Sequence, residues 1–179
     1  AFTYHNSFLV ADRHGALVLE TAGRRWQAHR ITGAYSISNG LTLPGLADES
    51  DPMRTHVSAC RLRRARTLAV AERAVDVRDL VRALRDHGDD SEPRYRLLNG
   101  AMAAPCMHAG GVAAASQSTA SWVAELRPEG TSQHWVTGTS APCTGLFKPV
   151  QVGSPLDLGP EPTDRYDHRS PWWRHELLH

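Results

Sequence analysis

The hydrophobic pattern of the first forty residues is the feature that most constrains the fold, because it has the two-residue period of strands. Apolar and β-branched residues run through residues 4–11 and 16–21, and a turn containing Gly15 separates the two runs. Two more extended runs follow at residues 26–31 and 34–38. Four strand candidates this close together predict an antiparallel meander with one face toward a core.

The period then changes to that of a helix. Residues 58–74 fit one helix, and residues 77–84 fit a second with apolar positions at i, i+3, i+4 and i+7. Asp76 is a typical N-cap for the second helix, which we expect to stop near Gly88. Residues 44–52 are predicted to be a loop before the first helix. Two consecutive helices therefore follow the meander.

Strand patterns return in the last third of the chain. Residues 118–126 and 133–137 are predicted to pair, and residues 147–152 form an edge strand because of Pro149. A short helix is predicted over residues 170–177. Strands, two helices and strands again predict an α+β fold of packed layers.

Charge and cysteine content narrow the class of function. The 179 residues hold 20 Lys and Arg against 19 Asp and Glu, a formal net charge of +1, and 41% of the residues are hydrophobic. This balance argues against disorder and against nucleic acid as a partner. No apolar run is long enough to span a membrane, so no membrane partner is predicted. Three widely spaced cysteines, Cys60, Cys106 and Cys143, favour a reduced, cytoplasmic setting.

Short blocks in order along nearly the whole chain suggest a known family. The blocks are residues 4–12, 19–26, 36–42, 106–109, 117–121, 147–149 and 172–176. Together they resemble the secernin and dipeptidase-A-like cysteine peptidases, which are N-terminal-nucleophile (Ntn) hydrolases. The resemblance implies an αββα sandwich, two antiparallel sheets flanked by helices. It also implies that residues 1–179 are the C-terminal part of a single such domain.

The same resemblance implies a mechanism without metal or cofactor. An N-terminal cysteine attacks the carbonyl of a small amide or dipeptide, its own α-amine acts as the base, and water resolves the thioester. Residue 1 is Ala, so we expect the nucleophile on a preceding N-terminal segment of the same protein and no activity from this chain alone. The alternative is a non-catalytic secernin-like binding or scaffold protein that retains the fold.

Two candidate catalytic residues follow from the resemblance. Asn39 matches the family's oxyanion-hole asparagine, although Asn-Gly is also the commonest two-residue hairpin turn. Arg61 is placed beside the nucleophile, where a cation favours thiolate. The register of this arginine among Arg61, Arg63 and Arg64 stays open, and a solvated basic helix face is the competing interpretation.

The remaining candidate site residues rest on weaker sequence signals. His5 and Asn6 on the opening strand are predicted to line the substrate cleft. Cys106 and His108 offer only two metal ligands, and packing is the favoured interpretation, so no metal site is predicted. Exposed edge strands make self-association into a homo-oligomer an open possibility.

Overall fold

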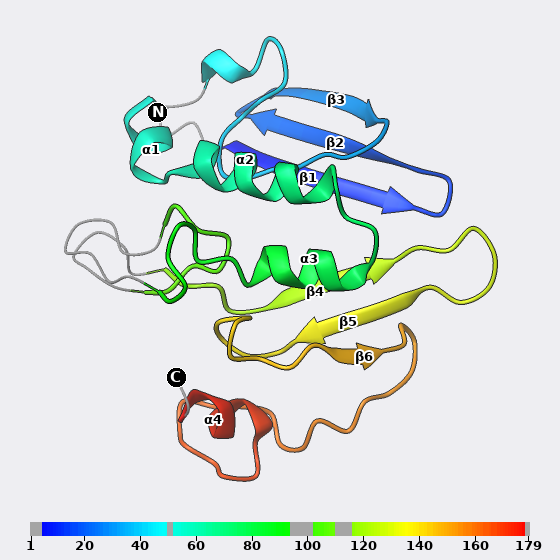
Figure 1. Ribbon diagram of the computed structural model, residues 1–179, viewed down its shortest axis with the longest axis vertical. Helices are drawn as coiled ribbons and strands as arrows, with labels where there is room; N and C mark the ends of the chain where they lie inside the picture. Colours follow the sequence, from blue (N-terminus) through cyan, green and yellow to red (C-terminus); the bar gives the residue numbers. More distant parts are fainter. Residues whose placement is uncertain (1–4, 50–51, 94–101, 110–115, 178–179) are drawn as a thin grey trace.

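The protein contains two small antiparallel sheets and four α-helices in the part of the chain that its structure describes. The computed structural model describes residues 5–49, 52–93, 102–109 and 116–177. The sheets lie one above the other in Figure 1, with α2 beside the first and α3 beside the second. The arrangement is α+β, as the order of strand and helix patterns predicts.

The first sheet is a meander with short turns. Asp12 pairs with Gly15 at one turn and Ala22 pairs with Arg25 at the next. The Asp12 carboxylate closes the first turn by accepting hydrogen bonds from the backbone N–H groups of His14 and Gly15, at 2.7 and 3.0 Å. The strands, in the order β1-β2-β3, are β1 (His5–Asp12), β2 (Gly15–Ala22) and β3 (Arg25–Ile31).

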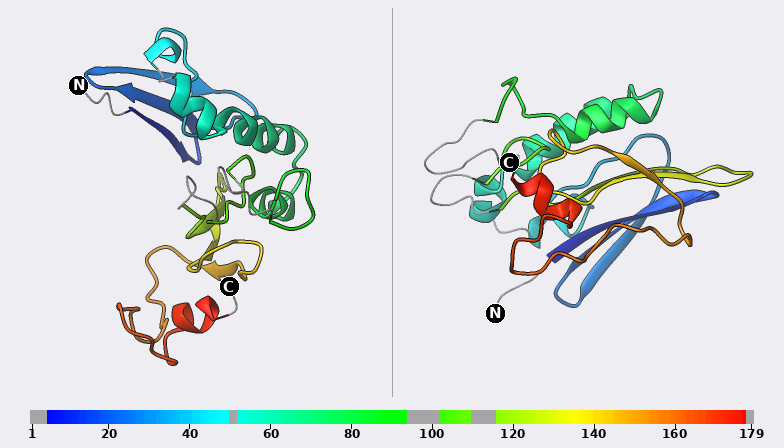
Figure 2. Two further views of the ribbon diagram at one scale, coloured as in Figure 1. Left: turned by 90° about the vertical axis from the view of Figure 1, so that its left-hand side faces the viewer. Right: turned by 90° about the horizontal axis from the view of Figure 1, so that it is seen from below.

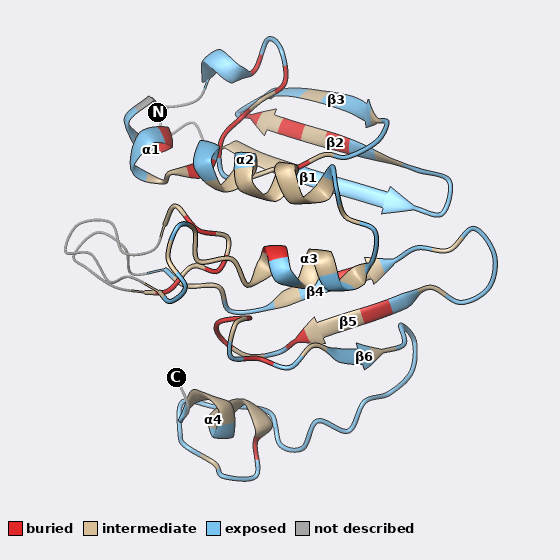
Figure 3. Ribbon diagram, viewed as in Figure 1, coloured by how far each residue is buried: buried red, intermediate tan, exposed pale blue. Residues whose placement is uncertain are grey.

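One face of β2 forms the core of this sheet. Val18, Glu20 and Ala22 are buried at alternate positions, as the period of a strand requires (Figure 3). Leu41 and Leu46 pack with Ala22, so the segment that follows β3 covers this face. The core face therefore lies under the chain that carries Asn39.

The fourth strand predicted in this region does not form. Residues 34–38 are extended but pair with none of the described strands. They lie against α2 instead, where the Ser36 carbonyl accepts a hydrogen bond from Arg64 Nε at 2.9 Å. The Ser36 hydroxyl also bonds the Thr67 hydroxyl at 2.5 Å. Side chains of the helix therefore hold a segment whose alternating pattern predicted a strand.

The helical region begins earlier than its pattern predicts and is broken near its start. Ala59 has a left-handed backbone, with φ 49°, and separates α1 from α2. Asp76 is the N-cap of α3, since its carboxylate accepts from the N–H groups of Arg78 and Asp79 at 2.8 and 3.2 Å. The helices are a 3-10 turn (Ala47–Glu49), α1 (Pro52–Val57), α2 (Cys60–Ala71) and α3 (Val77–Leu84).

The second sheet has the order β4-β5-β6 and packs on α3 through β4. Its third strand is short and contains Pro149, which lies at the sheet edge as predicted. The main contacts between the two halves run through α2 and α3, which contact each other. The strands are β4 (Ser121–Glu125), β5 (Gln133–Thr137) and β6 (Lys148–Val150).

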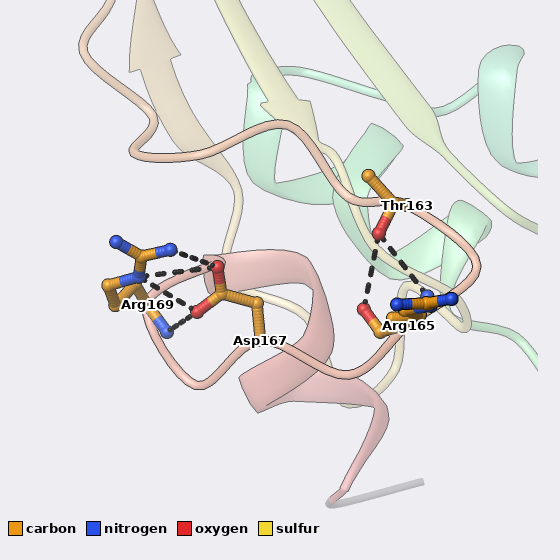
Figure 4. Close-up of polar contacts among 4 residues, drawn as sticks. All are labelled: Thr163, Arg165, Asp167 and Arg169. Atoms are coloured by element: carbon orange, nitrogen blue, oxygen red, sulfur yellow. Dashed lines mark hydrogen bonds and ion pairs between the residues drawn. The ribbon is translucent and has the colours of Figure 1, made fainter.

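The C-terminal helix, α4 (Pro171–Glu176), lies at the far end from the first sheet (Figure 2). Trp172 and Trp173 stack edge to face there, with ring centroids 4.7 Å apart, and Tyr166 lies 6.1 Å from Trp173. The chain that leads into this helix is held by local bonds such as those between Asp167 and Arg169 (Figure 4). Among the described helices, none combines the length and apolar character needed to cross a membrane.

Candidate functional site

His5, Asn39 and Arg63 come together beside the core face of the first sheet. Arg63 Nη2 donates to Asn39 Oδ1 at 2.6 Å, and His5 Nε2 donates to the Asn39 backbone carbonyl at 2.8 Å. Asn39 itself is exposed, and the other two side chains are half-buried. The predicted oxyanion residue therefore lies at the surface with a charged and an imidazole neighbour.

Asn39 and Gly40 do not form the hairpin turn that their sequence also allows. Gly40 packs against the start of α2, where a Cβ atom on it would lie 2.9 Å from Cys60 Sγ. Glycine suits this position because a Cβ atom would crowd the Cys60 thiol. This close approach keeps Asn39 next to α2.

Arg63, rather than Arg61, is the arginine that meets Asn39. Its Nη1 also donates to the carbonyls of Ser58 and Met102, so the guanidinium joins three segments. Burial lowers the pKa of Arg63, with Cys60 acting in the opposite direction, yet arginine remains charged at neutral pH. Arg61 is exposed on α2 and makes no polar contact with the described part of the chain.

Arg64 and Asn6 point elsewhere. Arg64 lies over the ring of Tyr35, 5.5 Å from its centroid, and binds the Ser36 carbonyl. Asn6 follows His5 in β1, so its side chain leaves the sheet on the opposite face from that of His5. The structure thus gathers His5 and Asn39 but not Asn6 or Arg61.

Glu20 is a residue of this region that the sequence analysis did not single out. Its side chain is fully buried and accepts hydrogen bonds from the N–H groups of Thr42 and Leu43 and from the Thr42 hydroxyl, all at 2.8–2.9 Å. These bonds fix the chain three residues after Asn39. The signal was present in the sequence, because Glu20 shares the inward face with Val18 and Ala22.

The cysteines differ in their surroundings. Cys60 is buried next to α1, with its thiol directed at the Thr55 carbonyl, 3.6 Å away. Cys106 Sγ and Cys143 Sγ each lie 3.4 Å from His108 Nε2. His108 therefore contacts two cysteines that are 37 residues apart in the sequence. Burial raises the pKa of the Cys106 thiol to about 12, so this cysteine is protonated and unreactive at neutral pH on its own.

Comparison with known protein families finds no family that matches the chain, and comparison with solved structures finds none that matches it. A function for this chain therefore has to be argued from its fold and from the contacts among its residues. The resemblance to the secernin and dipeptidase-A-like peptidases stays a prediction.

Proposed function

We propose that this chain contributes the oxyanion-binding part of a cysteine-type Ntn amidohydrolase that cleaves dipeptides or other small amides through a thioester. The observation that supports this proposal best is the hydrogen bond from Arg63 to the Asn39 side chain. Asn39 stabilises the oxyanion, and Arg63 holds Asn39 and supplies positive charge. We place the reaction in the cytoplasm, in keeping with three free cysteines.

The hydrogen bond determines which way the Asn39 amide faces. Arginine only donates hydrogen bonds, so the Asn39 atom nearest Arg63 is the acceptor Oδ1. The NH2 group then faces the other way, from an exposed position that a substrate can reach. A neutral N–H donor held in this way can stabilise a tetrahedral oxyanion without adding a group that titrates.

Arg63 takes the part that the resemblance assigned to Arg61. Its charge is held in place by three oxygen acceptors and lies next to the amide that would bind the oxyanion. A fixed guanidinium favours the thiolate form of a nearby cysteine as well as the developing negative charge on the carbonyl oxygen. Arg63 is thus a positioning residue for Asn39 and an electrostatic aid to the attacking thiol.

The attacking thiol comes from an N-terminal segment outside residues 1–179. Cys60 and Cys106 are buried, and Cys143 is half-buried beside His108, so none of the three offers an exposed thiol to a substrate. The second face of the first sheet is apolar and uncovered, with Phe8, Val10 and Trp26 46%, 55% and 70% exposed. An αββα sandwich would cover this apolar face with a second sheet.

Asn6 lies on that apolar face, so it would line the cleft between the two layers. His5 lies on the other face and supports the backbone of Asn39. His5 therefore positions the oxyanion donor. The substrate-binding role of Asn6 stays a prediction, because Asn6 lies on the opposite face from Asn39.

The first test is kinetic and uses the protein encoded by the complete reading frame that contains residues 1–179. Asn39→Ala should lower kcat for dipeptide hydrolysis about 10²–10³-fold, as expected for one oxyanion donor, with a smaller change in KM. Arg63→Gln should lower kcat more than Arg61→Gln, since only Arg63 holds Asn39. Arg82→Gln, an exposed arginine on α3, is the matched control and should leave both constants unchanged.

Two results would refute the proposal. One is hydrolysis that persists after alkylation of the N-terminal cysteine. The other is an intact protein that cleaves none of a panel of dipeptides and N-acyl amides, a result that favours the non-catalytic binding or scaffold alternative. Circular dichroism of each variant separates loss of function from loss of folding.

A further inference from the structure

Four cysteine and histidine side chains from three segments converge between the end of α3 and the loop after β5. One potential ligand atom from each lies within 4.8 Å of the other three. Cys106 and His108 are buried, and the remaining two are half-buried. The four residues are His87, Cys106, His108 and Cys143. We call them the Cys2His2 cluster.

The spacing inside the cluster matches that of ligands around one metal ion. A tetrahedral zinc ion has bonds of about 2.3 Å to sulfur and about 2.0–2.1 Å to nitrogen, which places neighbouring sulfur and nitrogen ligands about 3.5–3.6 Å apart. Both sulfurs lie 3.4 Å from His108 Nε2, and the rings of His87 and His108 are 5.2 Å apart. The cluster is therefore already close to the dimensions of a bound site.

His87 has the hydrogen bond typical of a metal-ligating histidine. Its Nδ1 lies 3.3 Å from the Ser91 carbonyl, which only accepts, so Nδ1 carries the proton. Its Nε2 is buried and has no hydrogen-bond partner among the described residues. A proton on one nitrogen, directed at a carbonyl, leaves the other nitrogen with a lone pair for a metal ion.

The backbone around the cluster is fixed without help from a metal. The N–H of Cys106 donates to the Asp86 carbonyl at 2.9 Å, which ties the second segment to the first. Arg85 donates to the carbonyls of Pro142 and Gly145 at 2.9 and 2.7 Å, which ties the loop of Cys143 to the end of α3. Ala141 in this loop is buried with a left-handed backbone, φ 54°, a strained conformation that its surroundings must maintain. The three ligand-bearing segments are thus held together in advance.

We propose that the Cys2His2 cluster binds one structural zinc ion. Zinc replaces the thiol protons of Cys106 and Cys143, which leave to solvent, and takes one nitrogen from each neutral imidazole. Two thiolates and Zn²⁺ give a complex with no net charge, which suits a buried position. Four protein ligands of sulfur and nitrogen in a tetrahedral arrangement are typical of structural zinc sites. The site is separate from Asn39 and Arg63 and does not depend on the amidohydrolase proposal.

The test measures metal binding directly. The protein, purified under reducing conditions, is stripped with a chelator and titrated with Zn²⁺ and with Co²⁺, and metal content is measured by elemental mass spectrometry. We expect one zinc per chain, and a cobalt form with the strong visible bands of tetrahedral Co²⁺ and a sulfur-to-cobalt charge-transfer band. Cys106→Ser, Cys143→Ser and His87→Gln should each weaken zinc binding at least about 100-fold, since even outer partners of a ligand contribute 10–100-fold.

Matched controls make the result specific. Cys60→Ser changes a cysteine outside the cluster, and His29→Gln changes an exposed histidine on β3, so both should keep one zinc with unchanged affinity. His87→Gln is the ligand variant least expected to disturb folding, since His87 is only half-buried. The proposal is overturned if the reduced protein binds no stoichiometric zinc, or if the three ligand variants bind it as tightly as the native chain. A disulfide between Cys106 and Cys143 in protein isolated from cells would also overturn it.

Discussion

Glu20 shows how one buried carboxylate organises a neighbouring loop. The strand places it inward, and three donors from Thr42 and Leu43 surround its oxygens. A buried carboxylate is tolerated only when its hydrogen bonds are made, so the loop and the strand depend on each other. Because Asn39 begins this loop, the carboxylate also supports the candidate site.

Replacing this carboxylate should destabilise the protein. Glu20→Ala leaves the buried N–H of Leu43 and the partly buried N–H of Thr42 without an acceptor. An unsatisfied buried group costs about 1–3 kcal/mol. We expect a loss of about 2–5 kcal/mol in the free energy of unfolding, measured by urea denaturation. Glu129→Ala, in an exposed turn, is the control and should change stability by less than about 0.5 kcal/mol. An effect at Glu20 as small as that of the control would show that the loop is held by other contacts.

Asp167 and Arg169 form a local ion pair in the segment before α4 (Figure 4). The hydrogen bonds from the Arg169 side chain and backbone lower the pKa of Asp167 from 3.8 to about 2. A carboxyl whose pKa is lower in the folded protein adds stability above pH 3.8, and this contribution is lost as the pH falls from about 4 to about 2. Both side chains are partly exposed, so salt should weaken the effect.

Carboxyl titration by nuclear magnetic resonance tests this pair. We expect Asp167 to titrate near pH 2 in the native protein and close to its ordinary value of 3.8 in Arg169→Gln. Arg165→Gln is the matched control, because Arg165 bonds Thr163 only through its backbone. A native pKa of 3.8 or higher would contradict the ion pair.

The boundary between α1 and α2 could not be predicted from the hydrophobic pattern of the sequence. The helical period runs through residues 58–74, but the helix is interrupted at Ala59, which has a left-handed backbone. The Ala59 N–H still donates to the His56 carbonyl at 3.1 Å. Arg63, one turn into α2 after this break, bonds Asn39. An alanine in the left-handed region costs about 1–2 kcal/mol relative to a relaxed backbone.

Glycine at this junction should therefore raise stability. Ala59→Gly removes the left-handed strain but adds about 0.4–1 kcal/mol of backbone entropy to the unfolded chain. The expected net gain is about 0.5–1 kcal/mol in urea denaturation. Ala65→Gly, at an exposed position within α2, is the control for glycine in a regular helix. It should lower the free energy of unfolding by about 0.5–1 kcal/mol. A loss at both positions would mean that Ala59 is not strained in solution.

Local signals in the sequence predicted most of the elements. The Asp12–Gly15 turn, the Asp76 cap and the Pro149 edge strand form as expected, because each depends on residues close together in the chain. Residues 34–38 differ because their alternating pattern is also compatible with an extended segment on a helix. Contacts with Arg64 and Thr67, about thirty residues away, decided between the two.

The arrangement of the two halves goes beyond what any local pattern indicates. The α+β class is confirmed, and among the described elements the contact between α2 and α3 is the main link between the two halves. The first sheet exposes apolar side chains such as Phe8 and Trp26 on the face opposite its core. This face is where the proposed sandwich would gain its second layer.

Strand periods, helix caps and turns were readable in the chain because they arise from steric and hydrogen-bonding preferences of neighbouring residues. Asn39 and Arg61 were the candidates from sequence, with the register among Arg61, Arg63 and Arg64 left open. Only the folded helix shows that Arg63 is the arginine that faces Asn39. From sequence, packing was the favoured interpretation of Cys106 and His108. The fold places His87 and Cys143 beside them, from segments about twenty and thirty-five residues away. Such meetings depend on how elements pack in three dimensions, because no spacing rule connects residues that only the folded chain brings within reach.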